Sequence, residues 1–253
     1  MNILRLQKVG LKIEKCWLVR NISITLPSQK LTVLIGPNGA GKTTILKLLT
    51  GLWKPTEGSV TLNSINLQKL QRAELARQLT LVPQTNNINF AFTVQDIVMM
   101  GRNPHLKRFQ PVMGLEHVKY AMEQTDISHL ANRLVTKLSG GEMQRVIIAR
   151  SLATQANIIL LDEPTANLDI SHVIEILELL KKLVADGHTI ILSIHDINLA
   201  VRYADNIIIV NKGNIVDSGH PEQVLTDKMI NNIFKIDLER ITTNKGEVMF
   251  FFK

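Results

Sequence analysis

Cysteine and long apolar runs are almost absent from this sequence. Cys16 is the only cysteine among 253 residues, which excludes an internal disulfide and a metal site built from several cysteines. No apolar run approaches the roughly 20 residues needed to cross a bilayer, and residues 1–12 contain no signal-peptide apolar core. These absences predict a cytoplasmic protein without membrane-spanning segments. Cys16, next to Trp17, is expected to be a small buried residue.

Clusters of basic residues are also lacking, although the chain is basic. Lysine and arginine number 29 against 22 acidic residues, for a net charge of +7, and the longest basic run is Lys181-Lys182. A basic balance permits nucleic acid or an anionic membrane as a neighbour, but scattered charges favour a solvated surface. We therefore expect no nucleic-acid partner. The apolar fraction of 45% is enough for a folded core.

A glycine-rich stretch after a predicted buried strand, Leu31–Ile35, carries the clearest chemistry. The letters GPNGAGKT match the G-x-x-x-x-G-K-[ST] phosphate loop at every fixed position, and residues 44–50 have helical spacing up to Gly51. Glycines let the backbone amides point inward at phosphate oxygens, while Lys42 adds charge and Thr43 offers a Mg²⁺ ligand. The predicted nucleotide-binding residues here are Gly36, Pro37, Asn38, Gly39, Ala40, Gly41, Lys42, Thr43 and Thr44.

Two acids follow a second buried strand, in the stretch NIILLDEP at residues 157–164. They would emerge at the carboxyl end of a parallel strand, where open sheets bind ligands. Asp162 can hold Mg²⁺, and Glu163 can polarise a water for attack on the γ-phosphate. The alternative is that the two acids only cap the end of a strand. A phosphate loop on the same predicted sheet makes this alternative weak.

The stretch LSGGE offers a second anion site at the start of a predicted helix. Ser139 and Glu142 have the spacing of a capping box. Gly140 and Gly141 would each cost roughly 1 kcal/mol in a helix interior, so packing does not explain them. They leave backbone amides bare at the positive end of the helix, where an anion can bind.

The remaining chain predicts an α/β fold in which strands alternate with helices. Strands 3–9 and 18–26 predict an antiparallel β subdomain, and helices 93–100 and 115–130 predict a helical insert. Further strands are expected at 58–62, 79–82, 158–161, 189–194, 207–210 and 215–218, with helices at 171–185 and 197–203. We predict one domain, with residues 1–84 and 148–253 as core and β subdomain and residues 85–147 as the helical subdomain.

The chain resembles the ATP-binding-cassette (ABC) ATPases over nearly its whole length. The resemblance is carried by three motifs in this order and spacing: the phosphate loop, LSGGEMQR and LLDEPTANLD. The resemblance implies a P-loop NTPase (RecA-like) core that hydrolyses ATP with Mg²⁺. It implies that Gln84 joins core to insert and senses Mg²⁺, and that Asp169 is the D-loop aspartate. It also implies that His195, at the end of a strand, contacts the γ-phosphate.

The same resemblance implies a head-to-tail dimer of two copies of the chain. ATP would lie between the phosphate loop of one copy and Ser139, Gly140 and Gly141 of the other, so the dimer would depend on ATP. The family places an adenine-stacking aromatic residue near Ile13, where this chain has only Trp17 close by. Stacking by Trp17 and poor stacking both remain open.

Residues 101–105, GRNPH, resemble an element common in ATPases of importers for iron chelates (siderophores), haem and cobalamin. This implies a transmembrane permease as partner, a solute-binding protein as indirect partner, and a location on the inner face of the membrane. A simple interhelix turn is the alternative for this segment. The function itself has rivals: an exporter-type ABC ATPase, a soluble nucleic-acid or ribosome-associated ATPase, and a regulatory module without turnover.

Overall fold

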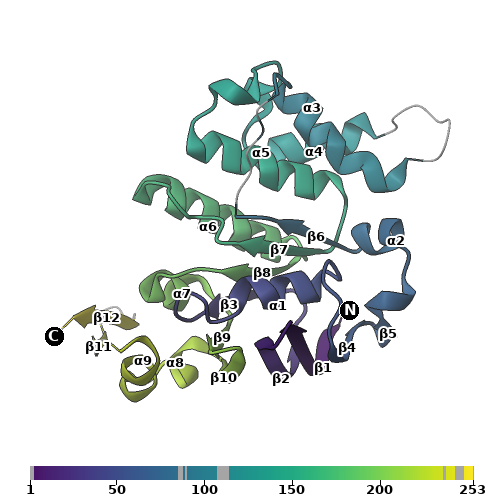
Figure 1. Cartoon of the computed structure of the whole chain (residues 1–253). Helices are drawn as coiled ribbons and strands as arrows, with labels where there is room; N and C mark the ends of the chain where they lie inside the picture. The colour runs from purple at the N-terminus through teal and green to yellow at the C-terminus, as the bar shows by residue number, and fades with distance from the viewer. Residues whose placement is uncertain are drawn as a thin grey trace.

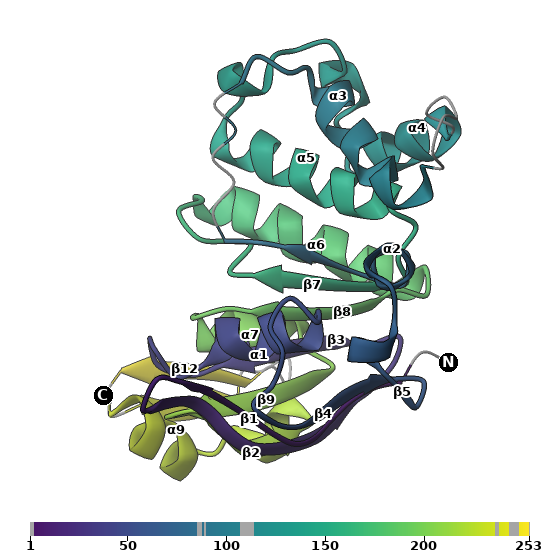
Figure 2. The same ribbon diagram turned by 45° about the vertical axis from the view of Figure 1, so that its right-hand side comes forward.

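The computed structural model describes residues 3–84, 88, 90–106, 114–235, 238–242 and 248–252. Most of the loose stretch expected before Gly114, and the expected start of the helical insert at residue 85, lie outside these ranges. Figures 1 and 2 show α3, α4 and α5 at the top of the molecule, strands β6, β7 and β8 in the middle, and β1, β2 and α9 at the bottom.

A six-stranded sheet forms the centre of the fold, with strand order β10-β9-β3-β8-β7-β6. Five of its strands, from β9 to β6, run parallel to one another, and β10 pairs antiparallel with β9. The central strands are buried along their whole length, as expected for parallel strands covered on both faces. The strands are β3 (Leu31–Ile35), β6 (Leu79–Val82), β7 (Ile158–Asp162), β8 (Thr189–Ser193), β9 (Asn206–Asn211) and β10 (Asn214–Gly219).

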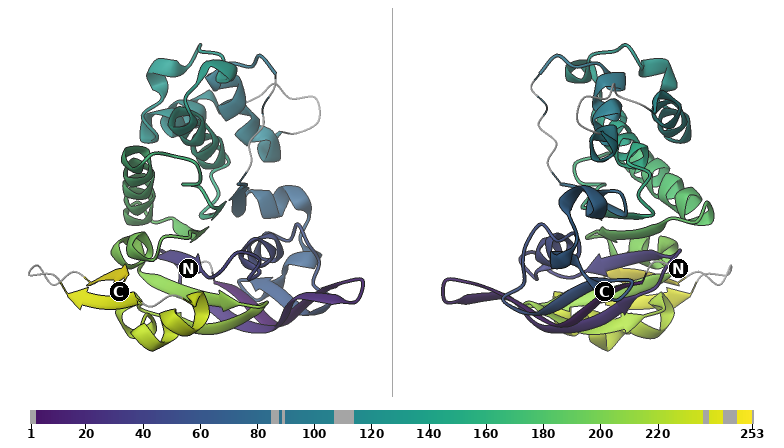
Figure 3. Two further views of the ribbon diagram at one scale, coloured as in Figure 1. Left: turned by 60° about the vertical axis from the view of Figure 1, so that its left-hand side comes forward. Right: turned by 90° about the vertical axis from the view of Figure 1, so that its right-hand side faces the viewer.

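A four-stranded antiparallel sheet, in the order β2-β1-β4-β5, lies beside the central sheet. Its hairpin of β1 and β2 extends beyond the rest of the molecule (Figure 3). Helix α1 (Lys42–Leu49) packs between the two sheets in a shared apolar cluster that includes Leu6, Leu46 and Leu160. The strands are β1 (Leu4–Ile13), β2 (Cys16–Leu26), β4 (Glu57–Leu62) and β5 (Ile65–Asn66).

Helices cover the other face of the central sheet and form the insert above it. The apolar cluster on that face includes Leu192 of the sheet, Ile147 of the insert and Leu180 of the covering helix. The insert contains α3 (Val94–Met99), α4 (Leu115–Gln124) and α5 (Gly140–Ala153), with the 3₁₀ helices η2 (Met100–His105), η3 (Ser128–Leu130) and η4 (Val135–Lys137). The other helices on this side are α6 (Ile170–Ala185) and α7 (Ile197–Tyr203). The predicted subdomain boundary at residue 147 falls within α5.

The fold class predicted from the sequence is confirmed, with two local corrections. Cys16 is exposed because it lies in β2 directly after the tight turn from β1. The helix expected over 115–130 ends at Gln124, because Asp126 has a left-handed backbone (φ 55°) and interrupts it. None of the helices in the described ranges is long and apolar enough to span a membrane.

The C-terminal segment adds elements that the sequence analysis did not predict. Strands β11 (Leu238–Thr242) and β12 (Val248–Phe252) pair as a hairpin that packs against α7. The Asn198 side chain of α7 donates to the Phe250 carbonyl (3.1 Å) and accepts from the Phe250 amide (2.8 Å). The remaining helices are η1 (Leu67–Lys69), α2 (Arg72–Ala76), α8 (Pro221–Val224) and α9 (Asp227–Phe234).

Candidate active site

The phosphate loop connects β3 to α1 and leaves the start of that helix open to a ligand. Gly39 and Gly41 have φ values of 74° and 109°, a region that disfavours other residues. Gly36 has no room for a side chain, because a Cβ atom would collide with the carbonyl of Val210. Gly41 is the N-cap of α1 and supplies no side-chain cap, so the first amides of the helix are available to an anion.

Lys42 is a buried cation, and in the described ranges its ammonium donates hydrogen bonds to two carbonyls of the loop. Its side chain is 5% exposed, and Nζ donates to the carbonyls of Gly36 (2.8 Å) and Pro37 (3.3 Å). Burial lowers the pKa of Lys42, and the negative charges of Glu163 and Asp162 act in the opposite direction. Phosphate oxygens at the loop would supply the anionic partner that a buried ammonium favours.

Asp162 ends β7 and lies opposite Ser193 in the sheet register. Its Oδ1 atom accepts hydrogen bonds from Thr43 Oγ1 (3.1 Å) and Ser193 Oγ (2.9 Å). A hydroxyl and a carboxylate beside a phosphate site are the hard oxygen ligands that Mg²⁺ prefers. No cluster of three or more His, Cys, Asp or Glu exists in the described part of the chain, so Mg²⁺ would also need phosphate oxygens or water. Thr43 and Asp162 therefore fit a Mg²⁺ ion that binds together with a nucleotide.

Glu163 lies at the centre of a hydrogen-bonded network, at the edge of the sheet where the parallel strands have their carboxyl ends. Its Oε2 atom accepts from Gln84 Nε2 and its Oε1 atom contacts His195 Nε2, both at 2.6 Å. Glu163 has a left-handed backbone, with φ of 49°, and its amide donates to Ser193 Oγ at 2.9 Å. A cavity of about 320 Å³ adjoins Glu163 and His195. The predicted residues Gln84, Glu163 and His195 thus meet at one point.

Ser193 is a site residue that the sequence analysis missed. Its hydroxyl is fully buried and links Asp162 to the backbone of Glu163. It holds both acids in place without being acidic or basic itself. The available signal was a lone hydroxyl at the end of an apolar strand, two residues before His195.

Ser139 and Asp169 belong to a second cluster, away from this network. Ser139 and Glu142 form the predicted capping box of α5, with bonds of 2.7 and 3.2 Å, and the bond from the Ser139 amide lowers the pKa of Glu142. Asp169 caps α6 and contacts His172, whose hydrogen bonds lower the pKa of Asp169 to about 2. Gly141 packs against the His172 ring, which would have to move to accommodate a Cβ atom at position 141. No hydrogen bond within the described ranges joins these residues to the phosphate loop of the same chain.

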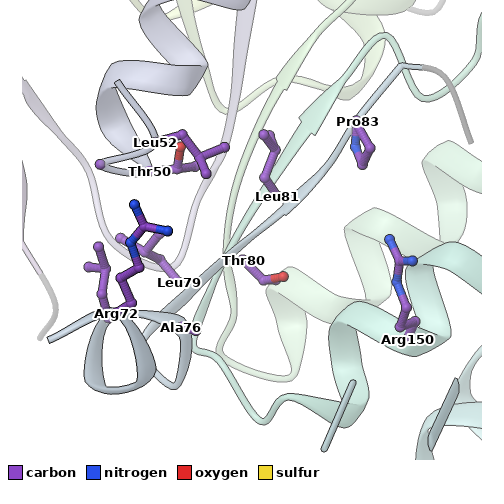
Figure 4. Close-up of a pocket in the computed structure, with 11 residues that line it drawn as sticks. Thr50, Leu52, Arg72, Ala76, Leu79, Thr80, Leu81, Pro83 and Arg150 are labelled. Carbon is purple, nitrogen blue, oxygen red and sulfur yellow. The ribbon is translucent and has the colours of Figure 1, made fainter. Parts of the chain in front are cut away.

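A groove of about 440 Å³ runs between the core and the insert (Figure 4). Strand β6 lies between Arg72 of α2 and Arg150 of α5, and Leu52, 64% exposed, adds apolar surface from the end of α1. Burial lowers the pKa of Arg150. Neither guanidinium pairs with a carboxylate among the residues that the structure describes. The groove is therefore lined by apolar surface and two cations without acidic partners.

The fold and the site together define a phosphate-loop nucleotide-binding protein with a helical insert and a separate signature cluster. The chain belongs to the ABC transporter family, whose model matches residues 19–166. Members that bind ATP in these transporters hydrolyse it to drive transport, so the predicted ATPase class is confirmed.

Curated relatives are import ATP-binding proteins. The chain is 37% identical to the iron(3+)-hydroxamate import ATP-binding protein FhuC of Bacillus subtilis, over 97% of this chain and 93% of that protein. It is 38% identical to the hemin import ATP-binding protein HmuV of Shewanella denitrificans, over 95% of this chain and 96% of that protein. It is also 39% identical to a cobalamin import ATP-binding protein of Halobacterium salinarum and 40% identical to an achromobactin transport ATP-binding protein of Dickeya dadantii.

Solved structures share the fold over 86% to 100% of this chain. An inward-facing ABC transporter assigned to the metal-chelate type superposes with a TM-score of 0.86 at 28% identity, covering 100% of this chain and 97% of that one. A bacterial ABC cassette solved as a dimer has a TM-score of 0.75 at 30% identity, covering 86% of this chain and 98% of that one. A related dimer was solved with ADP and phosphate, and ATP-type nucleotides are thus ligands of such cassettes.

Proposed function

We propose that this chain is the ATP-hydrolysing subunit of an importer for iron chelates, haem or cobalamin. The observation that carries the hydrolytic part is the network in which Gln84 and His195 both contact the Glu163 carboxylate at 2.6 Å. The importer class rests on the relatives, whose cargoes are iron–hydroxamate, haem, cobalamin and siderophores.

In this proposal the residues of the core site divide the tasks of binding and hydrolysis among them. The loop amides and Lys42 hold the phosphates, and Glu163 accepts a proton from the attacking water. His195 and Gln84 orient the Glu163 carboxylate, and both would contact the γ-phosphate of bound ATP. Thr43 and Asp162, with Gln84 nearby, would hold Mg²⁺, which when bound neutralises charge on the phosphate oxygens.

The second cluster is proposed to act on the nucleotide of a partner copy. The open amides at the start of α5 suit an anion, yet the described contacts leave them apart from their own phosphate loop. A head-to-tail homodimer would bring Ser139, Gly140 and Gly141 of one copy to the phosphate loop of the other. Asp169, at the start of α6, would lie near the same interface. The dimeric cassette among the similar structures supports this arrangement.

The groove beside β6 is the proposed contact for the membrane permease. A cytoplasmic helix of a permease could bury its apolar face on Leu52 and Leu75, and place acidic residues or terminal carbonyls at Arg72 and Arg150. The chain would then lie on the inner face of the membrane without entering it, and a solute-binding protein would act through the permease.

A cysteine crosslink tests the dimer and the ATP site together. In a Cys16→Ser background, protein carrying Ser139→Cys is mixed with protein carrying Asn38→Cys, which is exposed in the phosphate loop. We expect a disulfide-linked pair that forms only when ATP is present, and phosphate release by the unaltered protein. Equal crosslinking with and without ATP would refute the composite site, and absence of phosphate release would refute the proposed ATPase subunit.

A further inference from the structure

A cavity of about 510 Å³ lies among α6, α7, α8 and β12. Helix α7 lies between α6 and the C-terminal hairpin (Figure 1), and its Tyr203 hydroxyl donates to Glu178 Oε1 of α6 at 2.9 Å. None of the described lining residues belongs to the sites proposed above for nucleotide, Mg²⁺ or permease. The volume is in the range of cavities that hold small molecules.

The walls of this cavity are mainly apolar. Ile170 and Ile174 lie one turn apart on the same face of α6 and are 66% and 38% exposed. Leu199 of α7 and Val248 and Met249 of β12 add to this surface. Contact with an apolar ligand would remove these side chains from water, which is favourable.

Two of the charged residues in the wall neutralise each other. Lys181 Nζ donates to Asp205 Oδ1 at 3.0 Å, and Asp205 Oδ2 accepts from the Leu31 amide at 2.8 Å. This pair is therefore occupied within the chain and leaves no net charge for a ligand.

Arg202 is a lining cation without an acidic partner in the part of the chain that the structure describes. It is exposed, and its Cζ atom lies 5.7 Å from the centre of the Tyr203 ring. A guanidinium can bind an anionic group through two parallel hydrogen bonds. The other ionisable residues of the wall, His220 and Glu222, are both exposed, and Glu222 would oppose an anion at close range.

We propose that this cavity binds a small apolar molecule that carries one anionic group, with the anion held by Arg202 and the apolar body covered by α6 and β12. Ile170 and Leu199 also line the cavity beside Glu163 and His195. The ligand therefore touches the first turns of α6 and α7, next to the hydrolytic network.

A bound ligand stabilises the arrangement of helices that forms its cavity. It therefore opposes any rearrangement of these first turns during turnover and slows ATP hydrolysis. This regulatory consequence rests on the proposed function, whereas the binding site itself does not.

The binding part is tested with anilinonaphthalene sulfonate, an aromatic anion whose fluorescence rises in apolar surroundings. Saturating ATP without Mg²⁺ fills the nucleotide site of the full chain and prevents turnover. We expect one binding site, with an affinity about tenfold weaker in Arg202→Gln because a charge-assisted hydrogen bond is lost. Lys228→Gln, which removes an exposed cation of α9, is the matched control and keeps the affinity.

A neutral probe and two further variants separate the anion site from the apolar walls. Phenylnaphthylamine, which has the same rings without the sulfonate, should bind Arg202→Gln as it binds the unaltered chain. Ile174→Glu places a carboxylate in the apolar wall and should weaken both probes, whereas Glu222→Gln should tighten the sulfonate alone. Equal affinity of the sulfonate for the unaltered chain, Arg202→Gln and Ile174→Glu would overturn the site. Equal affinity of both probes for the unaltered chain would overturn the preference for an anion.

The regulatory part is tested by phosphate release with Mg²⁺ and saturating ATP. The sulfonate should slow release by the unaltered chain, at a concentration that leaves Ile174→Glu unbound and unaffected. An unchanged rate with the probe bound would overturn the regulatory role. Absence of phosphate release without any probe would refute the proposed ATPase subunit, while the affinities would still decide the cavity.

Discussion

Replacing Glu163 by glutamine removes a base and changes little else at the site. The amide has the shape of the carboxylate, and its oxygen can still accept one of the two hydrogen bonds that Gln84 and His195 now make. The Gln84 amide can turn over to satisfy the other position. The left-handed backbone at residue 163 is kept, and so is its bond to Ser193.

The expected loss therefore reflects proton abstraction. General-base catalysis contributes about 10²–10⁴-fold, which corresponds to about 2.7–5.4 kcal/mol at 1.36 kcal/mol per tenfold. ATP binding is expected to be unchanged or tighter, because one negative charge near the γ-phosphate is removed. With hydrolysis slowed, the ATP-bound dimer should persist.

Three measurements on Glu163→Gln check this reasoning. Phosphate release at saturating ATP gives the rate, a fluorescent ATP analogue gives affinity, and light scattering gives the lifetime of the dimer. Glu123→Gln, the same change at an exposed position of α4, is the control and should match the unaltered protein. A normal steady-state rate for Glu163→Gln would exclude this carboxylate as the base.

Three further outcomes are expected. Ser193→Ala strands the two groups that its hydroxyl joins, so we expect a loss of about 1–3 kcal/mol in free energy of unfolding and slower phosphate release, measured by denaturant titration and turnover. Asp169 should titrate near pH 2, so its stabilising contacts are complete above about pH 4 and lost as the pH falls toward 2, and His172→Ala should raise that pKa, as carboxyl NMR would record. Asn198→Ala removes two hydrogen bonds to β12, worth about 1–3 kcal/mol together, so amide exchange at residues 248–252 should accelerate; unchanged exchange would show that α7 does not hold the hairpin.

The sequence was sufficient for the parts of the site that lie at strand ends. Because β3 and β7 both pair in parallel with β8, the residues at their carboxyl ends meet at one edge of the sheet, and this brings Thr43, Asp162 and His195 to the same edge. The residue types and their order along the chain were enough to predict these three positions. Ser193 could not be predicted, because one hydroxyl at the end of an apolar strand has no distinctive pattern.

Contacts between distant segments were beyond sequence reasoning. Nothing in the letters GRNPH says that Arg102 reaches the end of a helix 51 residues later. The C-terminal hairpin was missed for a related reason, since its stability depends on packing against α7. Cys16 was predicted buried from its residue type, but its position at a hairpin turn decides its exposure.

In the proposed assembly, helix α5 would link the partner's nucleotide to the membrane permease. Its first turn carries Ser139 as N-cap, and its last turn carries Arg150 in the groove. Its 14 residues make a rod about 21 Å long, and eight of them are buried, so packing resists bending. In the proposed dimer, a displacement of Ser139 toward a partner's ATP would therefore be carried along α5 to Arg150 in the groove. At that end, Arg102 Nη1 donates to the Ala153 carbonyl at 2.7 Å and His105 Nε2 contacts the Thr154 carbonyl at 2.8 Å, and these contacts restrain the last turn against local fraying.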